Sequence, residues 1–577
     1  MFTLGILCGG PSLERGISLN SARVLLDHVD KNTVNIQAFF VDQKLRYYAI
    51  PNAQLYSNTP ADFDFKIHQV GQELAEENFI SSMQRCDLVF PVIHGSFGED
   101  GKLARLLERY HIPFVGNSSE ACKRVYAKDK VYHTLRQEGF HTLTWLRVDN
   151  NTSQDELKTF WTTHISDKAV IKPSEGGSSI NVHVIESFEA LCNTYQQLLT
   201  LYDCLVLQPY QHGTEFTILV MHNKDGEAVA LPATETVLHN QDAIYDYRTK
   251  YLPTNACTLY TPPKLSISDQ KKLSNQALTL FKQLNLRDFA RFDGYFMPGK
   301  GFVCNDINPY SGFEENSFIF KQSTHCGLTH KSLINLIIAQ ACRRLAITPP
   351  KNSEKSNTEK KPVYVLMGGS NAERQVSLMS GRNVWLKLLS SEKYQPTAIF
   401  IDPQQQAWQL PYSMFLQHTC EEVVEAITNY ASISAEEHEL CRAISKSLSV
   451  EHKDTNISHM PLDNFLSKVA KENAVVFLAL HGGIGEDGTI QKYLASYKIP
   501  HNGSKQDASA LCMNKYETQR MLAKHPHKGI QIAQQLCIDT SNISSWDRSI
   551  AKEYWEQLTK DIPNGPYIIK PRSEGCS

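Results

Sequence analysis

The chain has 577 residues, of which 21% are charged and 41% hydrophobic, and its formal net charge is -3. At roughly 100 to 200 residues per domain, this length suggests about three to five domains. The near balance of charge argues against a nucleic-acid partner recognised by bulk charge. Fourteen cysteines occur without a C-x-x-C pair, which argues against a disulfide framework or a zinc site.

The amino terminus, MFTLGILCGG, has the pattern of a strand that runs into a Gly-Gly turn. It contains Cys8, but it lacks the basic residues and the long apolar run of a lipoprotein signal. No uninterrupted apolar run approaches the ~18 residues that span a membrane. We therefore expect a cytoplasmic protein in a reducing compartment, without a membrane partner.

Strand and helix patterns alternate along the chain, which over the first 118 residues is the βαβ signature of a parallel sheet. The predicted strands are 3–8, 34–41, 87–93, 216–221 and 301–307. The predicted helices are 18–28, a segment after Glu99, 120–138, 268–284 and 328–345. These patterns predict an α/β fold of several lobes.

A polar loop between two strand patterns is the most informative stretch. Lys172 ends a β-branched run, and the loop Ser174–Ser179 holds two glycines and three serines. Glycine allows close approach, and free backbone N–H groups can donate to phosphate oxygens. A Walker or dinucleotide loop would lead into a helix. Here a second strand pattern follows, so we predict a hairpin, which by itself could also be an ordinary Gly/Ser turn.

Two aspartates further on lie in strand patterns and suggest a metal site. Asp306 is followed two residues later by Asn308, so both share one face of a strand, and Asp293 lies in the preceding strand pattern. Three oxygen ligands of this kind suit Mg²⁺ bound to nucleotide phosphates. Either aspartate alone could instead be a solvated strand acid.

Three further side chains are candidates for nucleotide contacts. Lys130 precedes a helical pattern and, with Lys172, could neutralise phosphate charge. Glu215 begins a strand pattern, where a carboxylate could accept ribose hydroxyls. Without other context, each lysine or glutamate could equally be a surface charge.

Three motifs recur in the same order along the chain, which indicates an internal repeat. The Gly-Gly-x-x-x-Glu-Arg segment that starts at Leu4 recurs from Val363, and the His-Gly-x-x-Gly-Glu-Asp-Gly motif of His94 recurs at His481. The Lys-Pro loop recurs at residues 568–577. We infer one and a half tandem copies.

The repeat and the composition divide the chain into lobes. Residues 347–362, rich in Pro, Lys, Ser and Asn, have the composition of a linker. The second copy has extra sequence, which we place near 403–470 because that region is helical and polar. The predicted domains are 1–118, an N-terminal α/β domain for substrate; 119–205, a central lobe; 206–346, a C-terminal lobe; 363–505, a second N-terminal domain; and 506–577, a truncated second central lobe.

Together these motifs resemble the D-alanine:D-alanine ligases of the ATP-grasp superfamily, which have three α/β lobes with a parallel sheet in the N-terminal domain. The resemblance covers nearly all of the first copy and the first two lobes of the second. It rests on the motifs around Glu14, His94, Asp129-Lys130, Lys172-Pro173, Tyr245 to Tyr251, Arg291-x-Asp293, and Asn308 followed by Gly312 and Ser317.

The resemblance implies that ATP phosphorylates one D-alanine and that the amine of a second attacks the acyl phosphate, to supply a peptidoglycan precursor. It also implies two magnesium or manganese ions. The implied nucleotide and metal residues are Lys130 and Lys172 for phosphates, Gln208 near the adenine, Glu215 for the ribose, and Asp293, Asp306 and Asn308 for the ions.

For the amino acids, the resemblance implies that Arg291 and the N–H of Gly312 stabilise the oxyanion. Glu14 binds the first ammonium, and His94 lines its pocket. The resemblance implies that Lys250 and Ser317 bind the second substrate's carboxylate or the transferring phosphate. It also implies that Glu14, Ser178 and Tyr251 form a hydrogen-bonded set that ties the first lobe to the two loops closing the site.

The first copy departs from the family pattern at several of these positions. Asp306 stands where a longer glutamate is usual, and Gln208 replaces a glutamate. Asn181 replaces a loop glycine, and Pro309-Tyr310-Ser311 replaces Thr-x-Pro. We still expect activity, with reduced activity or an altered choice of substrate left open.

The second copy keeps several family residues but not the metal acids or the arginine. The retained residues are Glu373, Ser377, His481, Lys515 and Lys570, while Cys576 occupies the position of Ser178. As given, this copy cannot bind Mg-ATP in the family's manner. We expect a ragged end there, or a fragment of a longer tandem enzyme.

Three hypotheses follow from the sequence. The first is a D-alanine:D-alanine ligase, which Lys250-Tyr251 favours over D-lactate-forming relatives. The second is a ligase for another amino-acid or hydroxy-acid pair. The third is a degenerate tandem protein whose second copy is a binding or regulatory module. The expected partners are ATP and D-alanine, with either a homodimer or pairing of the two copies within one chain.

Overall fold

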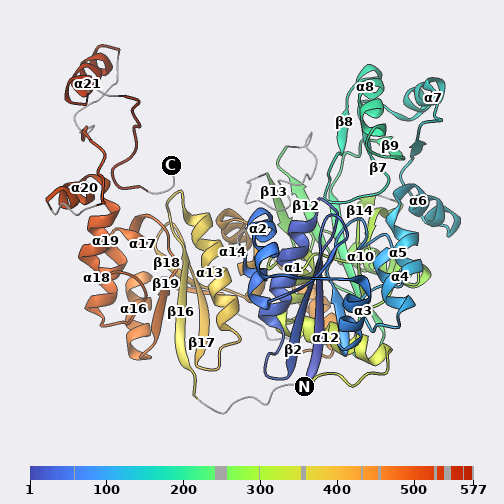
Figure 1. Cartoon of the computed structure of the whole chain (residues 1–577), viewed down its shortest axis with the longest axis horizontal. Helices are drawn as coiled ribbons and strands as arrows, with labels where there is room; N and C mark the ends of the chain where they lie inside the picture. The colour runs from blue at the N-terminus through green and yellow to red at the C-terminus, as the bar shows by residue number, and fades with distance from the viewer. Residues whose placement is uncertain are drawn as a thin grey trace. The chain divides into compact units, whose positions relative to one another are not determined.

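The protein is described by a computed structural model that covers residues 1–57, 59–240, 256–297, 299–351, 359–430, 433–451, 457–524, 529–538, 548–562 and 565–574. Two compact units make up the chain (Figure 1). Unit 1 comprises Met1–Ser356 and Tyr412–Thr455, and unit 2 comprises Asn357–Pro411 and Asn456–Ser577. A stretch from the second half of the chain therefore belongs to the unit built mainly by the first half.

The first sheet of unit 1 has the strand order β4-β3-β2-β1-β5. Its strands are β1 (Phe2–Gly9), β2 (Val34–Val41), β3 (Tyr47–Ile50), β4 (Gln72–Leu74) and β5 (Leu88–Pro91). The strand β1 pairs in parallel with β2 and β5, as the predicted strands 3–8, 34–41 and 87–93 require. The associated helices are α1 (Arg15–His28), α2 (Pro60–Val70), α3 (Glu76–Gln84) and α4 (Lys102–Arg109), with the 3-10 turn η1 (Asn52–Tyr56).

The second sheet of unit 1 is antiparallel and contains the predicted hairpin. Its order is β6-β9-β7-β8, with β6 (Leu146–Val148), β7 (Ala169–Pro173), β8 (His183–Ile185) and β9 (Leu205–Pro209). The loop 174–182 joins β7 to β8, which confirms that a strand and not a helix follows it. The helices α7 (Gln154–His164) and α8 (Phe188–Leu199) accompany this sheet.

In the stretch of chain between the first and second sheets, the predicted helix 120–138 is in fact two helices, α5 (Ser119–Tyr126) and α6 (Lys128–Gln137). Ala127 between them has extended backbone angles. The N–H of Lys128 donates to the carbonyl of Ser174 at 2.9 Å, outside its own helix. This contact joins the start of α6 to the hairpin loop.

The third sheet of unit 1 has the order β13-β12-β10-β14-β15, and β11 pairs with β10. Its strands are β10 (Glu215–His222), β11 (Ala228–Ala230), β12 (Thr234–Leu238), β13 (Cys257–Tyr260), β14 (Phe289–Met297) and β15 (Gly301–Asn308). Helix α10 (Ile267–Gln283) lies between β13 and β14 in sequence, and α11 (Phe318–Thr324) and α12 (His330–Arg344) follow β15. The predicted strands 216–221 and 301–307 and both predicted helices are confirmed.

Unit 1 also contains three elements from residues 412–455. They are η2 (Tyr412–Leu416), α14 (Cys420–Tyr430) and α15 (Ala435–Ser447). Among the described residues, the connection from β3 to β4 in the first sheet contains η1 and α2, so α15 is the additional helix of the second connection. It falls within the predicted insertion at 403–470.

Unit 2 has a sheet of the same order as the first sheet of unit 1, namely β19-β18-β17-β16-β20. Its strands are β16 (Lys361–Gly368), β17 (Tyr394–Ile401), β18 (Gln406–Gln409), β19 (Ser458–Pro461) and β20 (Val475–Leu478). Its helices are α13 (Arg374–Leu388), α16 (Leu462–Lys471), α17 (Gly483–Glu486), α18 (Thr489–Ser496), α19 (Gln506–Met513), α20 (Lys515–Lys524) and α21 (Arg548–Asp561).

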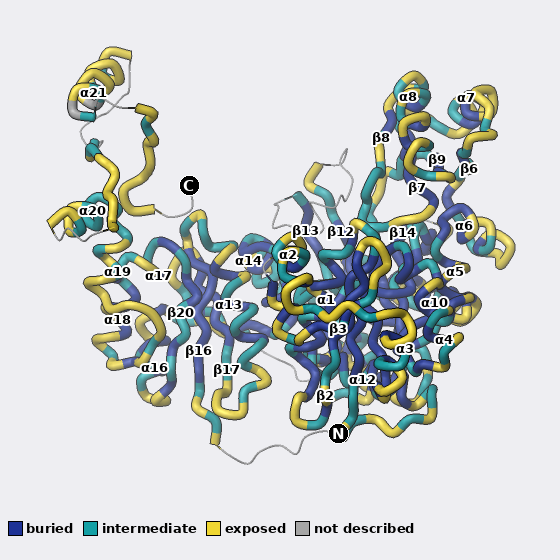
Figure 2. Tube along the Cα trace, viewed as in Figure 1, coloured by how far each residue is buried: buried dark blue, intermediate teal, exposed yellow. Residues whose placement is uncertain are grey.

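The buried residues follow the central strands of each sheet (Figure 2). Near the end of the chain, Ile568 and Ile569 are instead 87% and 84% exposed. The described residues 565–574 contain no strand, although this segment matches β7 in sequence. None of the helices in the described ranges is long and apolar enough to cross a bilayer.

A buried asparagine joins the first sheet of unit 1 to the third. Asn117 is fully buried, and its amide nitrogen donates to the carbonyls of Phe289 (3.1 Å) and Pro309 (2.6 Å). Its amide oxygen accepts the N–H of Arg287 at 2.7 Å. Because Phe289 begins β14 and Pro309 follows β15, this one side chain fixes both strands relative to the first lobe.

Replacing Asn117 with alanine should therefore destabilise unit 1. The variant Asn117→Ala removes the partner of two buried carbonyls and of one partly buried N–H. We expect a loss of about 3 kcal/mol in the free energy of unfolding, measured by urea denaturation. Asn150→Ala, at an exposed position, is the matched control and should stay within about 0.5 kcal/mol of the parent chain. Equal unfolding midpoints for both variants would contradict this role.

Candidate active site

Two adjoining cavities lie in unit 1. The first has a volume of about 390 Å³ and the second about 440 Å³. The residues that line both are Ser178, Glu215, Arg291, Asp293 and Asn308. A molecule in one cavity therefore meets a molecule in the other along β14 and β15.

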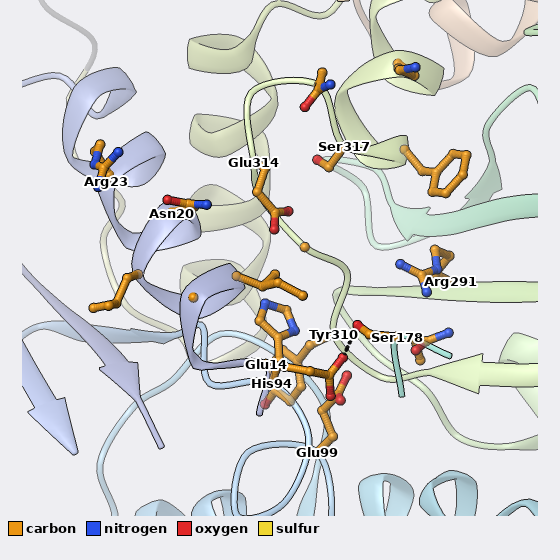
Figure 3. A pocket seen from close by; sticks show the side chains of 18 of the residues that line it. Glu14, Asn20, Arg23, His94, Glu99, Ser178, Arg291, Tyr310, Glu314 and Ser317 are labelled. Atoms are coloured by element: carbon orange, nitrogen blue, oxygen red, sulfur yellow. Dashed lines mark hydrogen bonds between the residues drawn. The ribbon is translucent and has the colours of Figure 1, made fainter. Parts of the chain in front are cut away.

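The first cavity brings the start of α1 against the hairpin loop (Figure 3). Glu14, at the N-cap of α1, accepts a hydrogen bond from the hydroxyl of Ser178. A Cβ atom at Gly177 would lie 2.9 Å from a carboxylate oxygen of Glu14, so glycine permits this close approach. The predicted contact between Glu14 and Ser178 is present, while Tyr251 lies outside the described residues.

Buried polar atoms without a hydrogen-bond partner gather in these cavities. In the described part of the chain they include His94 Nε2, Glu314 Oε1 and Ser317 Oγ in the first cavity. In the second they include Gln208 Oε1 and Thr236 Oγ1. Because buried polar groups are nearly always paired in folded proteins, these atoms indicate polar ligands.

The first cavity holds a neutral histidine and an acid of raised pKa. Burial, with a smaller effect from the charge of Arg291, lowers the pKa of His94 to about 3. The imidazole is therefore uncharged at neutral pH. Burial, and then the nearby charge of Glu14, raise the pKa of Glu99, which accepts the N–H of Gly95 at 2.7 Å.

The hairpin loop that lines the second cavity contains four residues with left-handed backbone angles. Gly176 has φ +122°, and Ser178, Ser179 and Asn181 have φ +53°, +55° and +57°. Asn181, which replaces a family glycine, tolerates this region better than most residues, and its amide donates to Tyr202 Oη at 2.6 Å. The departure at 181 therefore does not prevent the loop from folding over the cavity.

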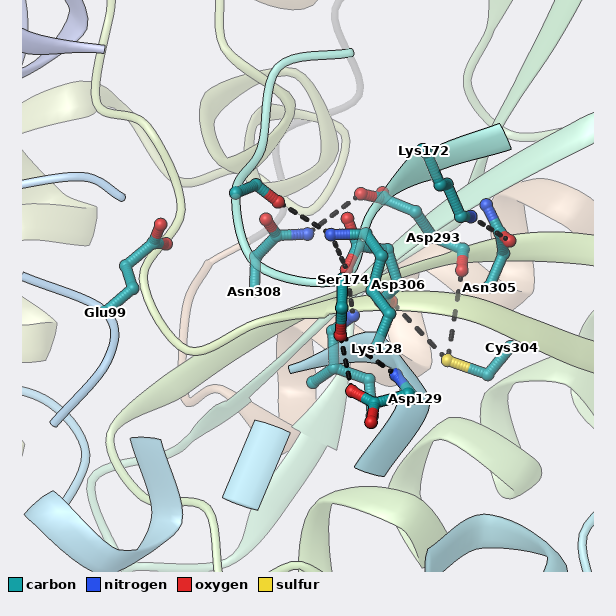
Figure 4. Close-up of polar contacts among 12 residues, drawn as sticks. Glu99, Lys128, Asp129, Lys172, Ser174, Asp293, Cys304, Asn305, Asp306 and Asn308 are labelled. Atoms are coloured by element: carbon teal, nitrogen blue, oxygen red, sulfur yellow. Dashed lines mark hydrogen bonds and ion pairs between the residues drawn. The ribbon is translucent and has the colours of Figure 1, made fainter. Parts of the chain in front are cut away.

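The two aspartates face each other where β14 pairs with β15 (Figure 4). One oxygen of Asp293 accepts from Arg291 and from the amide nitrogen of Asn308, both at 2.9 Å. Asp306 lies 3.5 Å from Lys128 Nζ. All of these residues line the second cavity.

This donor set fits a magnesium ion. Two carboxylates and an amide are oxygen ligands of the kind that Mg²⁺ prefers, and a few protein oxygens leave room for phosphates. The described residues contain no group of three or more His, Cys, Asp or Glu side chains placed to hold a metal. A metal here therefore depends on the amide oxygen of Asn308 as well as on Asp293 and Asp306.

Two lysines line the second cavity: Lys172, as predicted, and Lys128 in place of the predicted Lys130. Lys172 is buried and donates to Asn305 Oδ1 at 2.9 Å. Lys128 is buried and donates to the carbonyl of Gly176 at 2.6 Å. Lys130, the predicted phosphate ligand, is exposed and lines neither cavity. The break at Ala127 places Lys128, and not Lys130, under the loop.

Unit 2 shows the signal that could have identified Lys128. Lys515 begins α20 as Lys128 begins α6, and its N–H donates to the carbonyl of Arg572 at 2.9 Å. Its ammonium contacts the carbonyl of Glu574. Arg572 and Glu574 match Ser174 and Gly176 in the Lys-Pro repeat, so Lys515 corresponds to Lys128.

The structure thus brings most predicted residues together. Those that line the cavities are Glu14, His94, Lys172, Ser178, Gln208, Glu215, Arg291, Asp293, Asp306, Asn308, Gly312 and Ser317. Lys250 and Tyr251 lie outside the described residues. The cavity residues that the sequence analysis missed include Lys128, Asn305, Glu314 and His418.

Comparison with known families and relatives agrees with this geometry. The family description "D-ala D-ala ligase N-terminus" matches residues 3–117 and 362–504, and "D-ala D-ala ligase C-terminus" matches 134–339. The chain is 29% identical to the D-alanine--D-alanine ligase of Fervidobacterium nodosum, over 59% of this chain and 99% of that protein. It is 27% identical to the enzyme of that name from Oceanobacillus iheyensis, over 59% of this chain and 95% of that protein.

One solved structure supports the fold. The VanG D-Ala:D-Ser ligase from Enterococcus faecalis superposes with a TM-score of 0.52 at 21% identity, covering 59% of this chain and 99% of that one. In the first sheet β1 pairs in parallel with β2 and β5, whereas β3 pairs antiparallel with β2 and β4, so the predicted parallel sheet is only partly so. The family matches, the antiparallel sheets around the second cavity and the mixed first sheet lead to one conclusion. The chain is an ATP-grasp ligase of the D-alanine–D-alanine ligase family, with the partly parallel sheet that precedes the ATP-grasp lobes.

Proposed function

We propose that unit 1 joins two D-alanines to D-alanyl-D-alanine at the expense of ATP, for peptidoglycan precursor synthesis in the cytoplasm. The main support is that Arg291, Asp293 and Asn308 line both cavities. A nucleotide in the second cavity and amino acids in the first would meet at these residues. Family membership supports the reaction class.

In the second cavity, the cations would hold the phosphates of ATP. Lys128 and Lys172 are buried and lie beside the hairpin loop, which makes them the favoured phosphate ligands. Gln208 and Glu215 would contact the adenosine. Asp293, Asp306 and Asn308 would hold the two magnesium or manganese ions, whose charge would reduce repulsion between the phosphates and an incoming carboxylate.

In the first cavity, Glu14 would bind the ammonium of the first D-alanine, and neutral His94 would line its pocket. Ser317, together with Lys250, would bind the carboxylate of the second amino acid or the transferring phosphate. Arg291 and the N–H of Gly312 would stabilise the oxyanion, and electrostatic stabilisation of this kind is usually the largest single contribution to catalysis.

The proposed reaction has two steps. A carboxylate oxygen of the first D-alanine attacks the γ-phosphorus, and ADP leaves. The amine of the second D-alanine loses a proton and attacks the acyl carbon, so a C–N bond forms, the C–O bond breaks and phosphate leaves. The contact between Ser178 and Glu14 would keep the loop closed and exclude water from the acyl phosphate.

We also infer that the second half of the chain is a partial copy of the first. The repeated motifs and the shared strand order of the two N-terminal sheets support this inference. A binding or regulatory role for unit 2 is the alternative to a second active site.

Glu314 favours a second candidate substrate pair. Its Oε1 lies buried and unpartnered in the first cavity, next to the turn that carries Ser317. A carboxyl group there could accept a hydrogen bond from a hydroxyl side chain. D-serine as the second substrate is thus the alternative to D-alanine, and a structural neighbour is named a D-Ala:D-Ser ligase.

Phosphate release tests the function. With ATP and Mg²⁺, the full chain should release phosphate with D-alanine, or with D-alanine and D-serine, and mass spectrometry should identify the dipeptide. L-alanine is the control, and Arg291→Ala should abolish turnover because the oxyanion loses its cation. The absence of phosphate release with every D-amino acid and hydroxy acid would contradict both candidate pairs.

The two lysines can be separated by mutation. Lys128→Ala should raise the KM for ATP about tenfold or more, because a buried cation beside the phosphates is worth more than ~1.4 kcal/mol. Lys130→Ala, two residues away and exposed, is the matched control and should change this KM less than about twofold. A larger rise in the KM for ATP in Lys130→Ala than in Lys128→Ala would instead support Lys130 as the phosphate ligand.

The pKa of Glu314 gives a pH dependence of stability. Burial raises this pKa from 4.5 to about 7, so folding disfavours the charged form. The resulting cost is absent below pH 4.5, grows as the pH rises through this window and is complete above about 7.

Glu314→Gln should therefore stabilise unit 1 relative to the parent chain at pH 8, by up to about 3 kcal/mol, and the gain should shrink toward pH 4.5. Thermal unfolding at several pH values measures the difference. Glu138→Gln, at an exposed position, is the control and should show no such trend. A pH-independent difference for Glu314→Gln would show that its pKa is not raised.

A further inference from the structure

We propose that the segment Tyr412–Val450, from the second half of the chain, forms one wall of the first cavity and that His418 positions the turn 314–317 for the second amino acid. The proposal rests on the proposed function of unit 1. On this proposal, residues 412–450 of the second half of the chain are a component of the active site of unit 1 and not part of a separate module.

The segment is built into the core of unit 1. Leu416 and Val423 are fully buried, and Leu416 and Leu448 belong to the same hydrophobic cluster as Leu328 and Leu333 of the first half. The hydroxyl of Ser445 donates to the carbonyl of Cys326 at 2.9 Å. The segment therefore packs as an internal part of this unit.

A buried histidine links the segment to the turn. His330, fully buried, contacts the carbonyl of Glu315 through Nε2 at 2.8 Å and the hydroxyl of Tyr412 through Nδ1 at 2.7 Å. Since a carbonyl only accepts, Nε2 carries the proton and Nδ1 accepts from Tyr412. Tyr412 thus fixes the ring that holds the backbone of the turn.

His418 reaches the turn directly and lines the first cavity. The amide nitrogen of Asn316 lies 3.0 Å from His418 Nδ1, and because that nitrogen can only donate, Nδ1 accepts. The neighbouring Gln417 accepts from Lys321, another residue of the same cavity, at 3.5 Å. The turn itself presents the unpartnered atoms Glu314 Oε1 and Ser317 Oγ to the cavity.

The segment also supports the strand on another side of the cavity. Glu425, in α14, accepts hydrogen bonds from the hydroxyl of Tyr260 and from Thr258 Oγ1, the latter at 3.3 Å. Both residues lie in β13, whose Leu259 lines the first cavity. Two elements of the cavity wall, the turn and β13, are thus attached to one segment.

The corresponding connection of the first half lines the same cavity. The residues between β3 and β4 contribute Leu55, Thr59 and Phe63 to it, while the residues between β18 and β19 contribute His418. Equivalent connections from both halves of the chain therefore enclose one substrate space. A single first half would supply only one of them.

The test uses the full chain with ATP, Mg²⁺ and D-alanine. His418→Ala should raise the KM for the second D-alanine at least tenfold, with less than a twofold change in the KM for ATP. His418→Asn should restore most of the loss, because its Oδ1 can accept from Asn316 as Nδ1 does. Glu439→Gln, exposed on α15, is the control within the same segment. Thermal unfolding checks that each variant is folded.

The outcomes separate this proposal from the function on which it rests. An unchanged KM for the second D-alanine in His418→Ala, or an equal rise in both KM values without rescue by His418→Asn, would overturn the positioning role while leaving the ligase activity in place. Absence of phosphate release from the parent chain would overturn the function, and the role of His418 with it.

Discussion

The pairing of β14 with β15 is the constraint on which the site depends. It sets Asp293 opposite Asp306 in a partly buried position, where two like charges repel unless cations lie beside them. Arg291 and Lys128 supply these cations in the protein itself. The same arrangement suits the proposed chemistry, because Asp293 and Asp306 could hold a metal ion while Lys128 and Arg291 turn to the phosphates and the oxyanion.

The two cavities differ in the titratable groups that line them. The second gathers lysines and aspartates around a backbone loop, whereas the first contains neutral His94 and Glu314, whose pKa is raised to about 7 by burial. Glu14 and Lys321 also line the first cavity, which therefore offers charges of both signs to a small zwitterion, and the shared Arg291 remains to stabilise a developing negative charge. The contrast is consistent with a nucleotide on one side and amino acids on the other.

Much of this architecture could be predicted from local patterns. The strands of the first sheet, the hairpin around 174–182 and the pair Asp293 and Asp306 follow from periodicity and motifs that act over short distances. Lys128 was missed because the break at Ala127 accompanies a hydrogen bond to Ser174, a contact between distant residues. The place of residues 412–455 could not be predicted either, since sequence order assigns them to the second copy while burial of Leu416 and Val423 assigns them to unit 1.

The membership of Tyr412–Thr455 in unit 1 has a consequence for how such a chain can evolve. The core of unit 1 needs a segment that lies far along the chain, so folding ties the two parts of the coding sequence together. Loss of residues 412–455 would uncover apolar side chains of the first part, such as Leu328 and Leu333. Selection for a folded unit 1 therefore acts on this segment as well, whatever chemistry unit 2 carries out.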